Sequence, residues 1–181
     1  MPSVFLSPST QEYNPFITGG TEEYYANLIA DAMEPYLRAA GINFGRNNPA
    51  LLVQDSVRLS NMGNYDLHLA IHSNAAPENL AGQLQGSDVY YYANSNQGQR
   101  AAQIFADNLA IIYPYPELVS AVPTTQLYEL NNTRAPAVLV ELAYHDNPED
   151  AAWITENIER IAQNLSLSVT QFLGVPFSFP D

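Results

Sequence analysis

Two short apolar runs, each ending at a polar turn, constrain the fold of this chain more than any other feature. The first, LHLAIHSNAAP (Leu67–Pro77), carries His72 just before a loop of small residues, and the second, AVLVELAY (Ala137–Tyr144), carries Glu141 among apolar neighbours. Such runs are typical of buried strands, and α/β folds build their sites where strands end. A buried carboxylate is costly unless a partner, a metal ion or a transferable proton accompanies it. We therefore interpret His72 and Glu141 as candidates for metal-assisted hydrolysis.

Strand-like and helix-like segments alternate along the sequence, which indicates an α/β sheet within a single domain, residues 1–181. The predicted strands are Val4–Leu6, Ile42–Arg46, Asp66–His72, Asp88–Ala93 and Ala137–Tyr144. The predicted helices run from Thr21 to about Ala40, over Leu51–Met62, over Ser95–Ile112, from Asn147 through Trp153, and over Ile158–Leu173. The segment Val119–Leu130 is predicted to be irregular, with a short strand and a turn.

The composition excludes several classes of protein. Nineteen acidic against 6 basic residues give a net charge of −13, which is the wrong sign for binding nucleic acid or anionic membranes. The absence of cysteine excludes disulfides and thiolate sites, so any metal must be held by His, Asp or Glu. No apolar run approaches the ~20 residues of a membrane span. The segment MPSVFLSPST lacks the features of a signal peptide. We expect a protein that is cytoplasmic as translated, or that is released by another route.

Two of the three histidines share one face of a predicted strand. His68, Ala70 and His72 alternate with apolar residues that point to the opposite face. We interpret His68 as a core histidine with satisfied hydrogen bonds, whereas a ligand role and a structural role both stay open for His72.

Two glutamates differ in their local explanations. Glu23 lies in the first turn of a predicted helix, where an acid complements the helix dipole, so its simplest role is structural. Glu141 has no such explanation, and a salt bridge with Arg134 or Arg46 is the main structural alternative to a catalytic role.

Taken in order, three segments resemble the zinc-dependent N-acetylmuramoyl-L-alanine amidases of the type-3 amidase family. Glu23–Ile42 is similar to the family's Glu-x-x-x-Asn-Leu helix, LHLAIHSNAAP to its Ser-Ile-His-Ala-Asn-Ala strand, and APAVLVELAYHDNPEDAAWI to its Pro-Ala-Val-Leu-Val-Glu segment. The resemblance implies a six-stranded mixed, mainly parallel sheet flanked by helices on both faces. It also implies that Glu23 and His72 bind Zn²⁺ and that Glu141 is the general base.

The chain departs from the family at its first zinc ligand. The family's first strand ends in Asp-Pro-Gly-His-Gly, whereas this chain has Leu6-Ser7-Pro8-Ser9-Thr10 and no histidine before position 68. The stretch LSPSTQEYN resembles a branch of the family in which a histidine often stands where Tyr13 is. His145 is the predicted substitute, because it follows the strand that carries Glu141, and Glu12 is its rival. A weak or metal-free site stays open as the alternative.

The activity implied by the resemblance is hydrolysis of the amide between the muramoyl lactyl group and L-alanine in bacterial cell-wall peptidoglycan or muropeptides. Zinc would activate a water molecule, and Glu141 would carry its proton. Two alternatives remain: a catalytically silent peptidoglycan-binding module, and a zinc peptidase or deacylase acting on another amide. We also expect the polar loop Ser73–Gln85 to wall the substrate groove.

Overall fold

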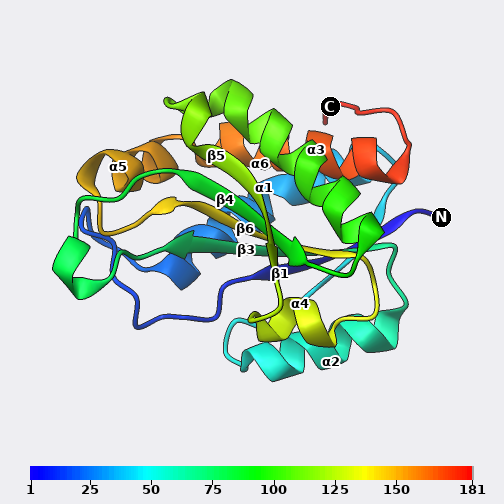
Figure 1. Cartoon of the computed structure of the whole chain (residues 1–181). Coiled ribbons are helices and arrows are strands. Elements are labelled where there is room, and N and C mark those ends of the chain that lie inside the picture. The colour runs from blue at the N-terminus through cyan, green and yellow to red at the C-terminus, as the bar shows by residue number, and fades with distance from the viewer. Residues whose placement is uncertain (181) are drawn as a thin grey trace.

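Six strands form a single sheet in the computed structural model, which describes residues 1–180 (Figure 1). Its strand order is β2-β1-β3-β6-β4-β5. β4 runs antiparallel to β6, and the other neighbouring strands are parallel. The predicted mixed, mainly parallel sheet is therefore confirmed. In chain order the strands are β1 (Ser3–Pro8), β2 (Asn43–Arg46), β3 (Leu67–Asn74), β4 (Ser87–Tyr92), β5 (Val119–Thr124) and β6 (Ala137–Tyr144).

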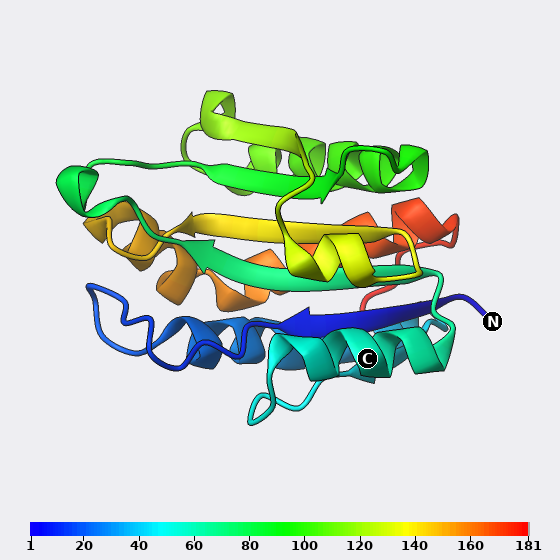
Figure 2. The same cartoon turned by 60° about the horizontal axis from the view of Figure 1, so that its bottom comes forward.

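Helices cover both faces of this sheet, as predicted. α1, α3 and α6 lie on one face, and α2 and α4 lie on the other, which Figure 2 shows from the side of α2 and α4. Among residues 1–180, no helix is long and apolar enough to cross a membrane. The helices are α1 (Glu22–Ala39), α2 (Val53–Gly63), α3 (Asn96–Ile112), α4 (Tyr128–Asn132), α5 (Pro148–Glu156) and α6 (Ile158–Leu173), with 3₁₀ turns at Glu78–Leu80 and Pro116–Leu118.

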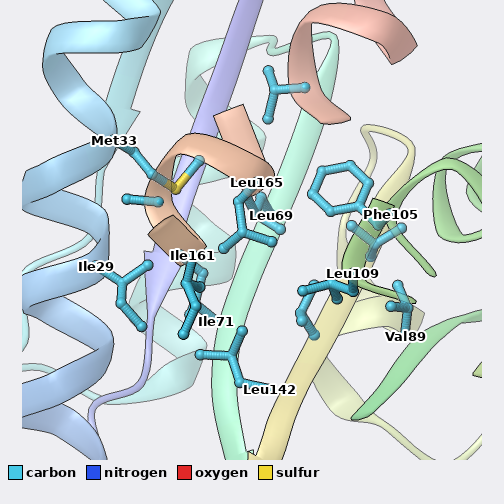
Figure 3. Close-up of a cluster of buried hydrophobic side chains, with 14 of the residues drawn as sticks. Ile29, Met33, Leu69, Ile71, Val89, Phe105, Leu109, Leu142, Ile161 and Leu165 are labelled. Atoms are coloured by element: carbon cyan, nitrogen blue, oxygen red, sulfur yellow. The ribbon is translucent and has the colours of Figure 1, made fainter. Parts of the chain in front are cut away.

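The alternation of side chains along β3 separates the main core from the site. Leu67, Leu69 and Ile71 are fully buried in the main core cluster. Figure 3 shows Leu69 and Ile71 packed against helices of the α1, α3 and α6 layer. Burying an aliphatic side chain of this size contributes about 1.5–3 kcal/mol, so this face holds the sheet to its helices. His68 and His72 point to the opposite face, toward α2 and α4.

The start of α1 is fixed by a side-chain cap. The Thr21 hydroxyl accepts a hydrogen bond from the backbone N–H of Tyr24, so the helix begins at Glu22. The sequence predicts that this helix starts at Thr21, and the structure confirms that start, with Thr21 as the N-cap residue. The cap places two glutamates, Glu22 and Glu23, in the first turn.

One element was missed by the sequence prediction. The segment predicted to be irregular forms β5 and then the short helix α4. A helix of five residues is too short to show a 3.6-residue apolar period, so only its packing against the sheet reveals it. The missed helix matters because it carries Glu129, which is buried beside His72.

Candidate active site

The sheet brings His72 and Glu141 side by side. β3 and β6 are parallel neighbours, and His72 is the register partner of Glu141. Partners in register point to the same face, so both side chains lie together near the C-terminal ends of their strands. On the far side of β6, Asp88 of β4 is paired with Glu141. The three residues form one polar row across three strands.

Glu22, from the first turn of α1, contacts His72. Its side chain is 2% exposed, and its Oε1 lies 2.8 Å from Nδ1 of His72. Its Oε2 accepts a hydrogen bond of 2.7 Å from the side-chain amide of Asn14, and its own backbone N–H donates to the Asn14 carbonyl. Burial opposes ionisation of Glu22, but the hydrogen bonds from His72 and Asn14 outweigh it and hold its pKa below the ordinary value.

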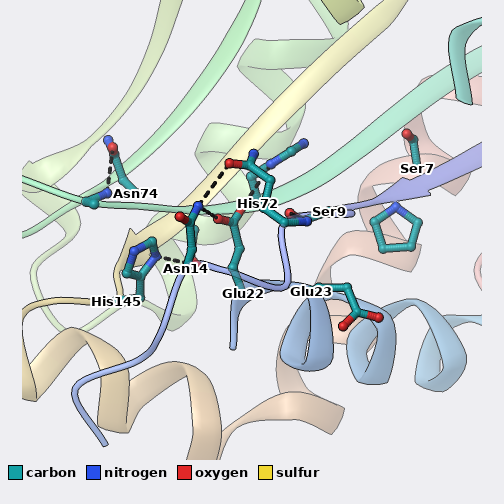
Figure 4. Close-up of polar contacts among 12 residues, drawn as sticks. Ser7, Ser9, Asn14, Glu22, Glu23, His72, Asn74 and His145 are labelled. Atoms are coloured by element: carbon teal, nitrogen blue, oxygen red, sulfur yellow. Dashed lines mark hydrogen bonds and ion pairs between the residues drawn. The ribbon is translucent and has the colours of Figure 1, made fainter. Parts of the chain in front are cut away.

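Glu23, the predicted ligand, does not face His72. Figure 4 shows its carboxylate directed away from the histidine, and within residues 1–180 no hydrogen bond or ion pair joins the two side chains. Successive helical residues are rotated by about 100°, so only one of two adjacent glutamates can point into the site. Glu22 therefore occupies the position beside His72 that the sequence predicts for Glu23.

His72 lies between two carboxylates. Glu22 approaches Nδ1, and Oε2 of Glu129 lies 3.5 Å from Nε2. Burial alone would lower the pKa of His72, but these carboxylates and the nearby Glu141 outweigh burial and raise it well above the ordinary value.

Glu141 is a partly buried carboxylate, and one of its two oxygens lacks a hydrogen-bond partner within residues 1–180. Its Oε2 is inaccessible and is unpaired among residues 1–180. Arg46 pairs instead with Asp31 and Glu34, so this arginine forms no salt bridge with Glu141. Burial raises the pKa of Glu141 to about 7. The charge of His72 acts to lower this pKa, whereas the charges of Glu22 and Asp88 raise it further. Such a group is poised to exchange a proton near neutral pH.

Glu129 is the site residue that sequence reasoning missed. It is 3% exposed, its Oε1 lies 2.8 Å from Nε2 of His68, and it accepts a hydrogen bond from the Ser7 hydroxyl. The available signal was a glutamate between apolar residues in the run LYEL. His68 itself is fully buried, with Ser60 and Glu129 on its two ring nitrogens, as expected of a satisfied core histidine.

Neither predicted substitute for the missing ligand forms a hydrogen bond or ion pair with Glu22 or His72 within residues 1–180. The ring of His145 stacks on Phe16 at 5.4 Å, and its Nδ1 lies 2.9 Å from the Ser73 hydroxyl. Within residues 1–180 no hydrogen bond or ion pair joins His145 to Glu22 or His72. Glu12 is exposed on the loop that lines the neighbouring groove.

A groove of about 540 Å³ opens beside His72. Its lining includes the polar residues Ser7, His72 and Glu129 and the apolar or aromatic residues Leu52 and Tyr128. None of the residues of the loop Ser73–Gln85 lines this groove. That loop instead packs on the segment after β6, where Ala76 and Gly82 donate backbone hydrogen bonds to Asp146. Its predicted role as a groove wall is not supported by this geometry.

A mixed α/β sheet that places a histidine and a poised glutamate at the ends of adjacent strands defines a hydrolase-type site. The model of the N-acetylmuramoyl-L-alanine amidase family, Amidase_3, matches residues 10–171, and the chain belongs to that family. No curated protein matches the sequence of the chain.

Solved structures of amidases share this fold. The catalytic domain of CwlV from Bacillus (Paenibacillus) polymyxa var. colistinus is 18% identical, with a TM-score of 0.84 over 97% of this chain and 100% of that one. AmiC2 of Nostoc punctiforme is 18% identical, with a TM-score of 0.82 over 96% and 97%. Ami1 from Mycobacterium smegmatis is 20% identical, with a TM-score of 0.81 over 96% and 97%.

The donors around His72 fit a divalent cation at two positions. A carboxylate and an imidazole nitrogen 2.8 Å apart are ligand types that zinc takes in hydrolases. Glu141 is the register partner of His72 on the neighbouring strand, and its Oε2 still needs a polar partner. Among residues 1–180, however, no three side chains from His, Asp and Glu gather as a metal-binding group.

Proposed function

We propose that the chain hydrolyses the amide between the lactyl group of N-acetylmuramic acid and L-alanine, and that it acts on bacterial cell-wall peptidoglycan. The observation that carries this proposal is the pairing of His72 with Glu141, whose partly buried carboxylate has a pKa of about 7 and one oxygen without a hydrogen-bond partner in the described chain. Family membership supports the choice of bond. The groove beside His72, with a volume of about 540 Å³, has room for a substrate segment larger than the scissile amide.

We further propose that zinc is the cofactor, held by Glu22 and His72. The third donor would be the side-chain amide oxygen of Asn14, because the amide group of Asn14 already touches Glu22. The orientation of an amide is set by its partners, so a cation beside Glu22 would favour the oxygen over the nitrogen. When bound, the ion would supply polarisation of the scissile carbonyl and acidification of water.

Glu141 would carry the proton through the reaction. Its carboxylate takes a proton from the attacking water and then delivers it to the nitrogen of the leaving L-alanine. A pKa of about 7 suits both duties, because base and acid forms are then both populated near neutral pH. Asp88, the register partner of Glu141 on β4, has a pKa raised by burial and adds negative charge that keeps the pKa of Glu141 high.

The second candidate function is a peptidoglycan-binding module without catalysis. The observation that favours it is that residues 1–180 contain no group of three His, Asp or Glu side chains arranged to hold a metal ion. Metal content of protein purified without chelators separates the two functions. One equivalent of zinc supports the amidase, whereas protein that takes up no zinc from a buffered zinc solution supports the binding module.

Digestion of purified muropeptides tests the activity directly. The wild-type protein should release stem peptides with a free L-alanine amino group, detected by mass spectrometry. Glu141→Gln preserves size and removes the proton carrier, so turnover should fall on the order of 10²–10⁴-fold. The matched control is Glu156→Gln, an exposed acid of α5, which should digest like the wild type. Equal turnover in Glu141→Gln and the control would remove Glu141 from the mechanism.

A further inference from the structure

A second buried carboxylate, that of Glu129 on α4, lies against the face of β3 that carries His72. His68, Ala70 and His72 lie in one row on β3, and Ala70 is paired with Ser7 of β1 and Leu139 of β6. Glu129 of α4 approaches both imidazoles: its Oε1 lies 2.8 Å from Nε2 of His68, and its Oε2 lies 3.5 Å from Nε2 of His72.

The two carboxylate oxygens of Glu129 have different partners. Oε1 is held by Nε2 of His68 at 2.8 Å and by the Ser7 hydroxyl. Oε2 is left for Nε2 of His72, 3.5 Å away. His68 is itself fixed from behind, with its Nδ1 2.9 Å from the Ser60 hydroxyl. The result is a buried chain of contacts that ends on the side of His72 opposite to Glu22.

A purely structural role would be to fasten α4 to the sheet. The contacts of Oε1 with His68 and Ser7 are sufficient for that role, because they already tie α4 to β3 and β1. The second oxygen would then be expected to face solvent or another structural group. It faces His72 instead, the one histidine that lines the groove.

We propose that Glu129 is a positioning residue that binds the Nε2–H of His72 and fixes the plane of its ring. With Nε2 engaged by Glu129, Nδ1 is the nitrogen directed at Glu22, where the proposed function places the cofactor. Carboxylates that bind the outer nitrogen of a histidine in this way set both its tautomer and its orientation. The part of this inference that concerns catalysis rests on the proposed function, whereas the orientation of the ring does not.

The ring orientation is tested on metal-free protein by ¹⁵N-correlated NMR of the histidine side chains at pH 5.5. We expect the Nε2–H proton of His72 to be protected from exchange with water in the wild type. In Glu129→Gln this protection should fall at least tenfold, while the Nδ1–H proton facing Glu22 stays protected. Ser7→Ala is the matched control, because it removes a contact of Oε1 and leaves Oε2 in place, so protection at Nε2 should persist.

Two results would overturn the proposal. An unprotected Nε2–H in the wild-type spectrum does so without any variant, which keeps the test valid even if Glu129→Gln fails to fold. Unchanged protection in a folded Glu129→Gln protein does so as well. Glu129→Asp keeps the charge on a shorter side chain and should retain part of the protection.

The consequence for catalysis is measured separately. If the muropeptide digest shows amidase activity, Glu129→Gln should lower kcat by about 10–100-fold with little change in KM, since substrate contacts remain. An unchanged kcat in a variant that has lost Nε2 protection would limit Glu129 to orienting the ring. A protected Nε2–H in a protein without amidase activity would refute the proposed function and leave the positioning role intact.

Discussion

Glu141→Gln should change how the stability of this protein depends on pH. The folded structure raises the pKa of Glu141 from 4.5 to about 7, so the folded state holds this proton more tightly than the unfolded chain does. Stability from this group is therefore complete below pH 4.5 and is lost as the pH rises toward 7. Since one pKa unit corresponds to about 1.36 kcal/mol, the loss amounts to about 3 kcal/mol above pH 7.

Glutamine carries no titrating proton and abolishes this loss. The difference in unfolding free energy between Glu141→Gln and wild type should therefore increase by about 3 kcal/mol between pH 4.5 and pH 8.5. The new amide adds a constant offset that does not depend on pH, so the change with pH isolates the ionisation. For a chain of this length the change corresponds to about 6–12 °C in Tm.

Urea unfolding at both pH values, with a chelator present, measures this difference. Glu156→Gln serves as the control, because its carboxylate is exposed and its profile should parallel the wild type. Repeating the measurement with zinc should shrink the effect, since a cation near Glu22 and His72 favours the ionised form of Glu141. Parallel profiles for Glu141→Gln and wild type in chelator would show that the carboxylate is not held in the unfavourable environment described here.

Three further outcomes are expected. Asn14→Ala should weaken zinc binding by about tenfold or more, measured in competition with a chromophoric chelator. His145→Ala and Glu12→Ala should weaken it by less than about tenfold. A larger loss in either of these two variants would support that residue as the zinc ligand predicted from the sequence. His145→Ala should instead lower Tm, because it removes the stacking on Phe16 and the contact with Ser73. Thr21→Ala should cost about 1 kcal/mol of stability by removing the cap of α1, and an unchanged Tm would argue against that cap.

The strands that carry the chemistry were predictable because their signals are local. Ala137–Tyr144 was predicted with the same bounds that the structure shows, since eight mostly apolar residues between turn signals leave few alternatives. The fold class then predicts that the strands carrying His72 and Glu141 belong to one sheet. His72 and Glu141 could therefore be singled out before their register was known.

The remaining site residues depend on information that is not local. Glu22 and Glu23 are adjacent acids in one turn, and only the position of the cap and the packing of the preceding loop decide which faces His72. Glu129 lies 122 residues from Ser7 in the sequence, although the two side chains are in contact. Its helix, α4, is too short to show a helical period in the sequence. Pairwise contacts of this range are set by tertiary packing, and no periodicity in the sequence encodes them.

The site is divided between a rigid part and a replaceable part. His72 and Glu141 are locked by the hydrogen bonds of β3 and β6, whereas the loop between β1 and α1 lies outside the sheet and leaves Tyr13 74% exposed at the edge of the groove. A change at that position disturbs no strand pairing and no buried packing. A single surface substitution such as Tyr13→His can thus change the chemistry of the groove edge, while His72, Glu141 and the strand pairing that holds them stay as they are.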